Sequence, residues 1–471
     1  MVYKYFIFKV FIITFIVTGV LYSEENDKSL EVTVIDANEV SAKQIPVKDE
    51  KKFLDKIIKQ KNVILKNVDG YIYNEYRYRM TDSEDDSDFT STLGFSTKND
   101  SNNFHFLGRT SVDIDNNSES NSAFSSISDT YNKNLNMKVY SAYFNLNSNN
   151  RLSKFNLGRQ SIYDTPESAF FDGMRIESKY LTSHRFKIGL YGGKPVHLYE
   201  SSSSGDQILG AYAIGSLSSK ASIKIDQMRI KDAYRTMNYR NDLTNFRYTY
   251  RYNKRTRFSM AYSMIDNLDR DINIKVKYIN IKTGTSIFLT SYLLINGQQQ
   301  NALEFSSYQS ILQSLEPYYK TRIYIKKKIN DIFSLDTGLM FRTMKNIQDK
   351  GTYNREYHQY HVGGTFNIPG KTNPVLSINL EQWDSDNRVV HSYGIDYQSF
   401  IKDKYTVGFG SYFSLYKYDI FLNSERDEVQ TYHAFLKVKL TKALNLRSSY
   451  SYENDDYEAY HIVKIGVRCH F

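Results

Sequence analysis

The sequence has few of the residues that crosslink or kink a chain. Its 471 residues include one cysteine, one tryptophan and six prolines. The lone Cys469 cannot form an internal disulfide, and no cysteine or histidine spacing typical of a zinc or redox site is present. After residue 23, no stretch approaches the roughly 18 apolar residues of a membrane-spanning helix. We therefore expect neither a disulfide framework nor a transmembrane helix beyond that residue.

Aromatic and charged side chains are abundant instead. The chain has 41 tyrosines and 28 phenylalanines, and 24% of its residues are charged. Its mean hydropathy is nevertheless negative, at −0.53. Because tyrosine and phenylalanine are favoured in strands, this aromatic-rich, polar and proline-poor composition predicts an all-β protein.

The first residues have the pattern of an export signal. Met1–Ser23 begins with Lys4 and Lys9, continues as an apolar run over Val10–Leu21 and is followed by acidic residues. A basic start, an apolar core and a polar end are typical of a secretory signal peptide. The alternative is an uncleaved membrane anchor, because Tyr5–Tyr22 is nearly long enough to span a bilayer. We expect cleavage at the end of the segment and export of the rest.

Residues 24–65 form a polar N-terminal extension. Within it, Asp49–Gln60 places four apolar side chains on one helical face, which predicts a short amphipathic helix. The extension is too short to build a core of its own. We assign residues 66–471 to a single larger domain.

From Val68 onward, apolar and polar residues alternate. In Leu243–Asn253, one face carries phenylalanine and tyrosine while the other carries arginine, threonine and asparagine. Arg255–Met264 and Tyr432–Leu440 repeat the pattern. Strict alternation predicts strands with one apolar and one polar face. Runs of about ten residues also suit a tilted strand that crosses a bilayer.

The links between these runs alternate between short turns and generally longer loops, such as 116–134, 231–242 and 296–315. Short turns at one rim and long loops at the other are typical of outer-membrane barrels. We predict an all-β fold, a transmembrane antiparallel up-and-down β-barrel of about 22 strands, within a range of roughly 18–24. The segment 302–315 is either a loop or an extra pair of strands.

The chain ends on an alternating strand with a terminal aromatic residue. Tyr460–Phe471 reads YHIVKIGVRCHF. It resembles the C-terminal signature of bacterial outer-membrane barrels, in which the last aromatic, here Phe471, is the assembly signal. The resemblance implies a Gram-negative outer membrane, with its lipid, its lipopolysaccharide and the barrel-assembly machinery as partners. The alternative is a soluble β-protein that ends on an aromatic by chance.

The polar faces would line the lumen of such a barrel, because backbone groups in lipid must pair internally and the sheet must close. Cations outnumber acids on these faces. The predicted pore-lining residues are Arg77, Arg79, Arg109, Arg159, Arg175, Glu177, Arg185, Lys187, Arg247, Arg251, Arg257, Lys275, Lys277, Lys320, Arg322, Arg342, Lys437, Lys439, Arg447, Lys464 and Arg468. A basic lining favours anions, so we predict a mild anion preference. The alternative is that inward charges hydrate a wide lumen and pair with one another.

No catalytic residue, cofactor or metal site is predicted. The acidic run Thr81–Asp88 offers oxygens of the kind that calcium prefers, but it lacks the glycine and distal glutamate of a calcium-hand loop, which favours a solvated loop. His358 and His361 are three residues apart and so lie on opposite faces of a strand. No nucleophile elbow, HExxH motif or phosphate loop is present. The cations are spread over many strands, so nucleic acid is not an expected partner.

One stretch suggests a family. Residues 158–177 read GRQSIYDTPESAFFDGMRIE, which predicts a strand, a proline-containing loop and a returning strand. A GRQ strand before an FDG-x-R strand resembles the alginate-export-type family of outer-membrane porins, although this loop is short and lacks the tryptophan usual there. The resemblance implies a monomeric barrel whose arginine-lined lumen passes anionic or polar solutes, including oligosaccharides. Arg159 and Arg175 either brace the wall or contact the solute.

The sequence therefore predicts a non-enzymatic outer-membrane porin for passive diffusion or export of small polar or anionic solutes. One alternative is a structural or adhesive surface barrel with a closed lumen. Another is a receptor-type active transporter, which would need a plug domain of well over a hundred residues before the barrel. A barrel of this size is normally obstructed. The extension 24–65 or the infolded loops 116–134 and 296–315 are the candidate obstructions.

Overall fold

A computed structural model describes residues Asn67–Phe471 with several gaps. The gaps are 98–101, 115–134, 147–151, 164, 166–167, 182–184, 197–204, 235–236, 297–315, 346–355, 386–387, 403, 420–423 and 456–457. The predicted signal peptide, the extension 24–65, the extra strand pair at 302–315 and most of the two candidate infolding loops lie outside the described residues and stay predictions. Two compact units divide the chain, Met1–Asn67 and Val68–Phe471, and the second is described here.

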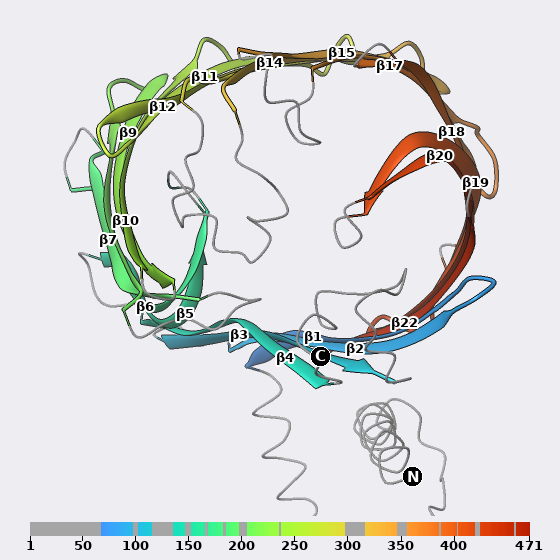
Figure 1. The fold of residues 1–471 in the computed structure, drawn as a ribbon, viewed down its shortest axis with the longest axis horizontal. Helices are drawn as coiled ribbons and strands as arrows, with labels where there is room; N and C mark the ends of the chain where they lie inside the picture. The colour runs from blue at the N-terminus through green and yellow to red at the C-terminus, as the bar shows by residue number, and fades with distance from the viewer. Residues whose placement is uncertain are drawn as a thin grey trace, which may run out of the picture. The chain divides into compact units, whose positions relative to one another are not determined.

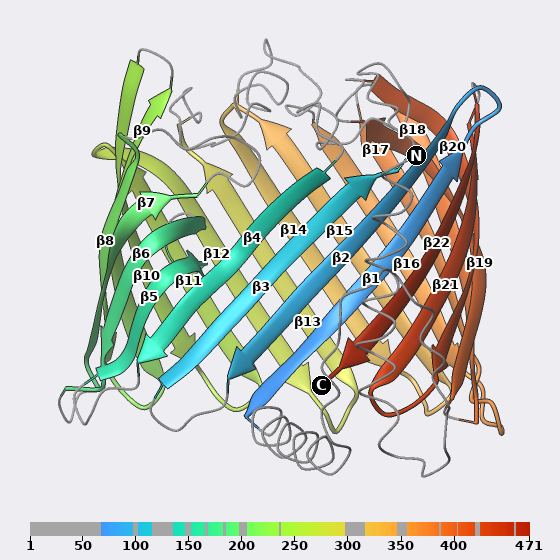
Figure 2. The same ribbon diagram turned by 90° about the horizontal axis from the view of Figure 1, so that it is seen from below.

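This second unit is a closed barrel of 22 antiparallel strands, which confirms the predicted fold and strand number (Figures 1 and 2). The strands are β1 (Val68–Met80), β2 (Asp85–Thr97), β3 (Asn102–Asp113), β4 (Leu135–Leu146), β5 (Leu152–Ile162), β6 (Ala169–Ser178), β7 (Lys187–Pro195), β8 (Gln207–Ser216), β9 (Ala221–Tyr234), β10 (Met237–Arg251), β11 (Thr256–Ile265), β12 (Leu268–Asn280), β13 (Thr285–Leu294), β14 (Tyr318–Lys328), β15 (Phe333–Met344), β16 (Tyr357–Asn367), β17 (Val375–Ser385), β18 (Arg388–Ile401), β19 (Tyr405–Asp419), β20 (Ser424–Lys439), β21 (Leu444–Asn454) and β22 (Ala459–His470). Among the described residues, no helix is long and apolar enough to cross a membrane.

The first and last strands close the sheet. β1 pairs with β22 from Tyr71 opposite His470 to Met80 opposite His461. Beyond the ladder, the Phe471 amide donates to the Gly70 carbonyl at 3.0 Å and the Gly70 amide donates to the Phe471 carbonyl at 2.9 Å. The backbone of the terminal residue therefore joins the start of β1 to the end of β22 at one rim.

The region predicted as a long loop at 231–242 is instead a strand hairpin. β9 continues to Tyr234 and β10 begins at Met237, and the two strands pair along this whole stretch. The prediction was wrong because it equated polar sequence with loop. These strands project beyond the rest of the wall, as Figure 2 shows at its upper left, so they need no apolar face there.

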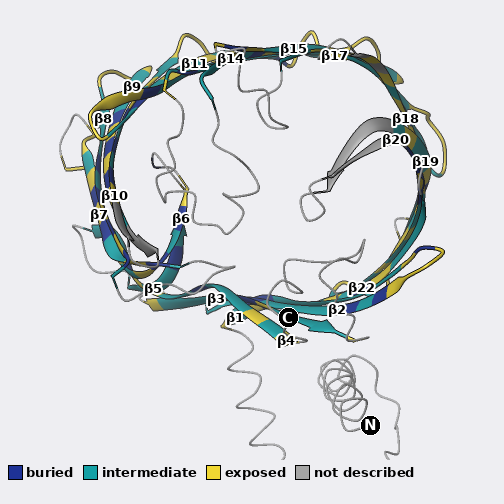
Figure 3. Ribbon diagram, in the orientation of Figure 1, coloured by how far each residue is buried: buried dark blue, intermediate teal, exposed yellow. Residues whose placement is uncertain are grey.

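One stretch of sheet leaves the wall and folds into the barrel. Nine buried side chains, here called the lumen cluster, pack together: Ile162, Ala169, Phe171, Tyr191, Ile208, Tyr212, Met228, Ile230 and Leu243. They come from six consecutive strands, β5 to β10. Residues on β5 can touch residues on β10 only if the sheet curls over, and Figures 1 and 3 show β6 inside the ring. Burial of each large apolar side chain of this kind contributes about 1.5–3 kcal/mol to the free energy of folding.

A row of glycines permits the curl. Gly158, Gly173 and Gly193 lie directly opposite one another on β5, β6 and β7. A Cβ added at Gly173 would lie 2.1 Å from the Gly192 carbonyl oxygen, and one added at Gly193 would lie 2.1 Å from the Asp172 carbonyl oxygen. Gly158 also has a φ of 122°, which favours glycine. Side chains on the concave face would hold the strands apart.

The curl separates β5 from β4. These strands pair only from Ala142 opposite Arg159 to Asn145 opposite Asn156. Above that point, β4 continues to Leu135 beside β3, whereas β5 and β6 stay paired with each other to Ile162 and Ala169. The wall therefore divides at this place.

We predict that Gly173→Ala destabilises the barrel by about 1–3 kcal/mol, because the new methyl group meets backbone that must shift. Urea unfolding of the refolded protein in detergent micelles measures the change. Gly370→Ala is the matched control, since its Cβ would have no atom within 4 Å. Equal stability of the two variants would show that the close approach at Gly173 does not matter.

Candidate functional site: the lumen surface

The lumen wall brings cations together at the seam of the barrel. Lys437 of β20 lies directly opposite Arg447 of β21, and Lys464 of β22 lies directly opposite Arg77 of β1. Arg468 of β22 shares this face. Like charges directly opposite in an antiparallel pair destabilise a sheet. Their presence here therefore needs a reason other than stability.

A second basic stretch follows β10 to β15. Arg257 of β11 lies opposite both Arg251 of β10 and Lys277 of β12. Lys320 of β14 lies opposite Arg342 of β15. The guanidinium of Arg342 stacks on the ring of Tyr318, with its carbon 4.1 Å from the ring centre. The pattern of opposed cations thus recurs on a separate part of the wall.

Carboxylates offset some of these charges, and two of them lie in a segment expected to be a loop. Asp88 forms an ion pair with Arg77, and Asp86 lies 2.5 Å from Arg79. The run Thr81–Asp88 was expected to be a solvated loop, yet β2 begins at Asp85 within it. A short hairpin would have revealed the pairing, because it places Asp86 opposite Arg79 and Asp88 opposite Arg77.

An acidic strip runs along β15 to β18. His361 lies between two carboxylates, with Nε2 at 2.7 Å from Asp336 and Nδ1 at 3.1 Å from Glu381. On the next strands, His433 Nε2 lies 3.0 Å from Asp396. His361 and Gln359 face the lumen side by side, so His358 points the other way, as the spacing predicted. Within the described residues, no group of three acids, histidines or cysteines could hold a metal ion.

Glu177 is the centre of a polar network below the lumen cluster. Its carboxylate pairs with Lys187, lies 3.7 Å from Arg175 and accepts hydrogen bonds from the Tyr212 hydroxyl and, at 2.9 Å, from Ser153 Oγ. Arg175 Nη2 donates to the same tyrosine at 3.1 Å. One carboxylate thus neutralises two cations, and these cations brace the wall.

Arg159 does not join that network. Its guanidinium makes a two-pronged ion pair with Asp172, at 2.7 Å for each bond, and donates to the Val139 carbonyl at 3.2 Å. By register, Arg159 shares a face with Leu157 and Asp172, opposite to the face of Arg175. Both arginines were expected on the lumen face, and the strand alternation separates them.

Arg185 also departs from its expected place. It lies in an exposed turn before β7, with a φ of 49°, rather than on a strand. The other predicted pore-lining residues are in strands. The register puts these on the lumen face: Arg77, Arg79, Arg109, Arg175, Glu177, Lys187, Arg247, Arg251, Arg257, Lys275, Lys277, Lys320, Arg322, Arg342, Lys437, Lys439, Arg447, Lys464 and Arg468. Their contact with a solute stays a prediction.

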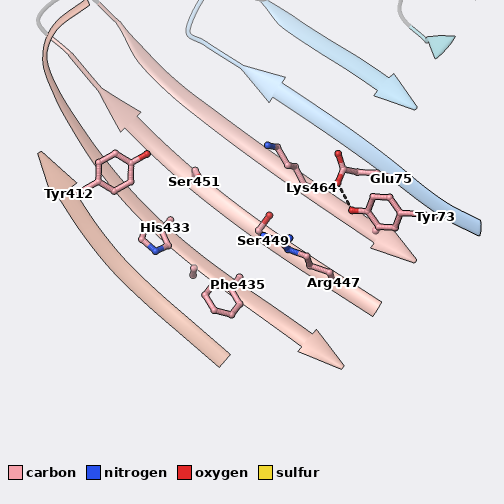
Figure 4. A pocket seen from close by; sticks show the side chains of 11 residues that line it. Tyr73, Glu75, Tyr412, His433, Phe435, Arg447, Ser449, Ser451 and Lys464 are labelled. Carbon is pink, nitrogen blue, oxygen red and sulfur yellow. Dashed lines mark hydrogen bonds between the residues drawn. The ribbon is translucent and has the colours of Figure 1, made fainter. Parts of the chain in front are cut away.

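A recess of about 350 Å³ opens on the wall across the seam (Figure 4). Five strands contribute to it, β1 and β19 to β22. Its lining is Tyr73, Glu75, Tyr412, His433, Ala434, Phe435, Arg447, Ser449, Ser451, Lys464 and Gly466. Two cations, several hydroxyl groups and the ring of Phe435 thus surround one volume, which suits a ligand with both an anionic and a hydroxyl-bearing part.

Among the described residues that line the recess, Glu75 is the only carboxylate, and it is engaged on one side. The Tyr73 hydroxyl donates to Glu75 at 2.5 Å, shown as the dashed line in Figure 4. Among the described residues, neither Arg447 nor Lys464 has a carboxylate within 4.0 Å. Lining residues such as Tyr73 and Ser449 carried no sequence signal, because hydroxyl side chains alternate on many strands of this chain.

We predict that Glu177→Gln lowers the free energy of unfolding by about 3 kcal/mol, because loss of the carboxylate charge leaves two largely buried cations uncompensated. Asp331→Asn is the control: its ion pair with Lys328 stands in an exposed turn, so the variant should match the unmodified protein. Urea unfolding in micelles compares the two. Equal effects would mean that the Glu177 network contributes nothing beyond a surface pair.

No family model and no curated protein matches the chain. Among solved structures, the copper transporter OprC is similar at 8% identity with a TM-score of 0.50, over 86% of this chain and 80% of that one. The PapC translocation pore of the P pilus usher gives 0.49 at 10% identity and Acinetobacter baumannii OccAB4 gives 0.41 at 9%; each comparison covers 86% of this chain, with 99% and 97% of theirs. At such identities the likeness concerns the fold alone, which is a β-barrel.

Proposed function

We propose that this protein is an outer-membrane channel for passive diffusion or export of small polar, mainly anionic, solutes or oligosaccharides through a basic lumen. One observation carries the proposal: cations stand directly opposite cations on the lumen face, at Lys437 and Arg447, Lys464 and Arg77, and Arg251 and Arg257. A solvated anion between such pairs relieves their repulsion.

Both faces of the wall support an outer-membrane location. Large apolar side chains such as Leu380, Phe409 and Leu157 are more than half exposed or close to it on the face opposite the polar lining. Such an outward band suits lipid. The predicted signal peptide and the aromatic end of β22 are consistent with export and with recognition by the barrel-assembly machinery. Lipid and lipopolysaccharide would then surround the protein.

The inward curl of β5 to β10 bears on how open the channel is. The lumen cluster fills part of the interior with apolar side chains, so the curl narrows a barrel that would otherwise leak. The described residues of the curl do not cover the opposed cations of β20 to β22. The recess beside these cations therefore stays accessible. This favours a channel over a surface barrel with a closed lumen, and a wall of diffusely placed charges favours transport over catalysis.

The resemblance to alginate-export-type porins enters the proposal through residues 158–177. Arg175 and Glu177 of that motif face the lumen and are bound to each other, whereas Arg159 is bound to Asp172. In this chain the motif therefore organises the curl. The solute-binding part of the proposal rests on Arg447 and Lys464 instead.

We predict that Lys437→Gln, Arg447→Gln and Lys464→Gln together move the selectivity of the channel toward cations. The reversal potential in a planar bilayer with a potassium chloride gradient measures this selectivity. The unmodified protein should prefer chloride, and the triple variant should lose most of that preference, because about three positive charges leave the wall.

The control is a triple variant with the same change of charge in exposed turns, Lys254→Gln, Lys282→Gln and Lys371→Gln. It should keep the original reversal potential, since its lysines stand outside the strands. A cation preference in the unmodified channel would refute the proposed solute class. Absence of any current from the folded protein would refute the channel itself and favour the adhesive alternative.

A further inference from the structure

We propose that the division between β4 and β5 is a lateral portal, through which a single-chain amphiphile with an anionic head passes between the lumen and the outer half of the bilayer. The inference goes beyond the proposed diffusion channel and shares with it the membrane location and an open lumen. It starts from the pairing of these strands, which ends at Ala142 and Arg159.

Strand geometry gives the depth of the division in the membrane. β4 has 12 residues, so at about 3.3 Å per residue and a tilt near 45° it rises roughly 28 Å. The four residue pairs with β5 account for about 9 Å of that rise, beginning at the rim of short turns. An apolar band of about 25 Å therefore extends well above the last pair. The division opens at the depth of the outer acyl chains.

Open sheet edges are not tolerated against hydrocarbon, since their polar groups need partners. At the β4 edge a side chain supplies one such partner, because Arg159 donates to the Val139 carbonyl. The bidentate bond to Asp172 fixes the guanidinium at the lower end of the division. A charged pair with side chains 29% and 45% exposed thus replaces the backbone ladder where the strands part.

Apolar and cationic side chains line opposite sides of this division. Leu135 and Met137 of β4 are 58% and 68% exposed, the latter the most exposed methionine of the described residues, and both lie on the lipid side. On the lumen side, Arg109 of β3 lies opposite Lys138 of β4. A molecule that crosses here meets cations inside and methyl groups outside. An amphiphile with an anionic head and a single alkyl chain matches this arrangement, since its head suits the cations and its chain suits the methyl groups.

The test uses the full-length protein in lipid vesicles with Cys469→Ser as background, so that an introduced cysteine is the only thiol. Met137→Cys is treated with a small sulfonate-bearing thiol reagent, which puts a negative charge at the lipid-side mouth. The probe is a pyrene-labelled decyl sulfonate, which stays charged and crosses pure bilayers slowly. Quenching by a quencher coupled to a dextran that is too large for the channel and is trapped inside the vesicles reports arrival of the probe in the interior.

Modified Met137→Cys should transfer the probe at least about tenfold more slowly than the unmodified variant, which corresponds to about 1.4 kcal/mol. Leu380→Cys is the matched control: it is 57% exposed, faces lipid and lies on β17, which is paired on both sides. Its modification should change nothing. Equal transfer before and after modification of Met137→Cys, or equal slowing of the control, would overturn the portal.

Chloride conductance in the same vesicles separates this proposal from the proposed function. We expect the conductance to be the same before and after modification, because the reagent lies outside the lumen. Probe transfer together with a current that shows no preference for chloride over potassium would leave the portal standing and refute the proposed solute class. Chloride current with probe transfer no faster than in protein-free vesicles would refute the portal alone. Arg159→Ala should also slow transfer, since it removes the charge at the lower end of the division.

Discussion

The closed backbone ladder is the constraint on which the rest of this structure depends. A sheet in lipid has no water to satisfy its edges, so the first strand must meet the last, and β1 does so with β22 along ten residue pairs. Closure also fixes which face of each strand is wet. When Leu380 and Phe409 point outward, the residues next to each of them on the same strand point inward. The alternation within each strand therefore determines which side chains line the lumen.

The same constraint explains why so many specialised residues lie where β5 and β6 leave the wall of the barrel. Folding a hairpin inward breaks the ladder with β4, and the loss is offset by the lumen cluster, by Glu177 and its partners, and by the Arg159–Asp172 pair. The glycines opposite one another on β5, β6 and β7 give the curl its tight radius. The curl therefore narrows the lumen beside β5 to β10.

Much of this was predictable from sequence, for physical reasons. Alternation with period two gave the strand number, the closing strand and the inward face of residues such as Lys464 and Arg447. The curl was not predictable, because Ile162 and Leu243 are brought together by the path of the sheet and no local pattern announces that contact. Arg159 was placed on the wrong face because an arginine on the outward face is exceptional, and only its register with Asp172 reveals it.

The recess at the seam has a consequence for assembly. Tyr73 and Glu75 come from the first strand, whereas Lys464 and Gly466 come from the last, and these residues become neighbours only when the sheet closes. A partly assembled barrel therefore has no such recess. Any solute that occupies it holds the two ends of the sheet together and favours the finished barrel by mass action. Occupancy of this one site would thus report that insertion of the protein is complete.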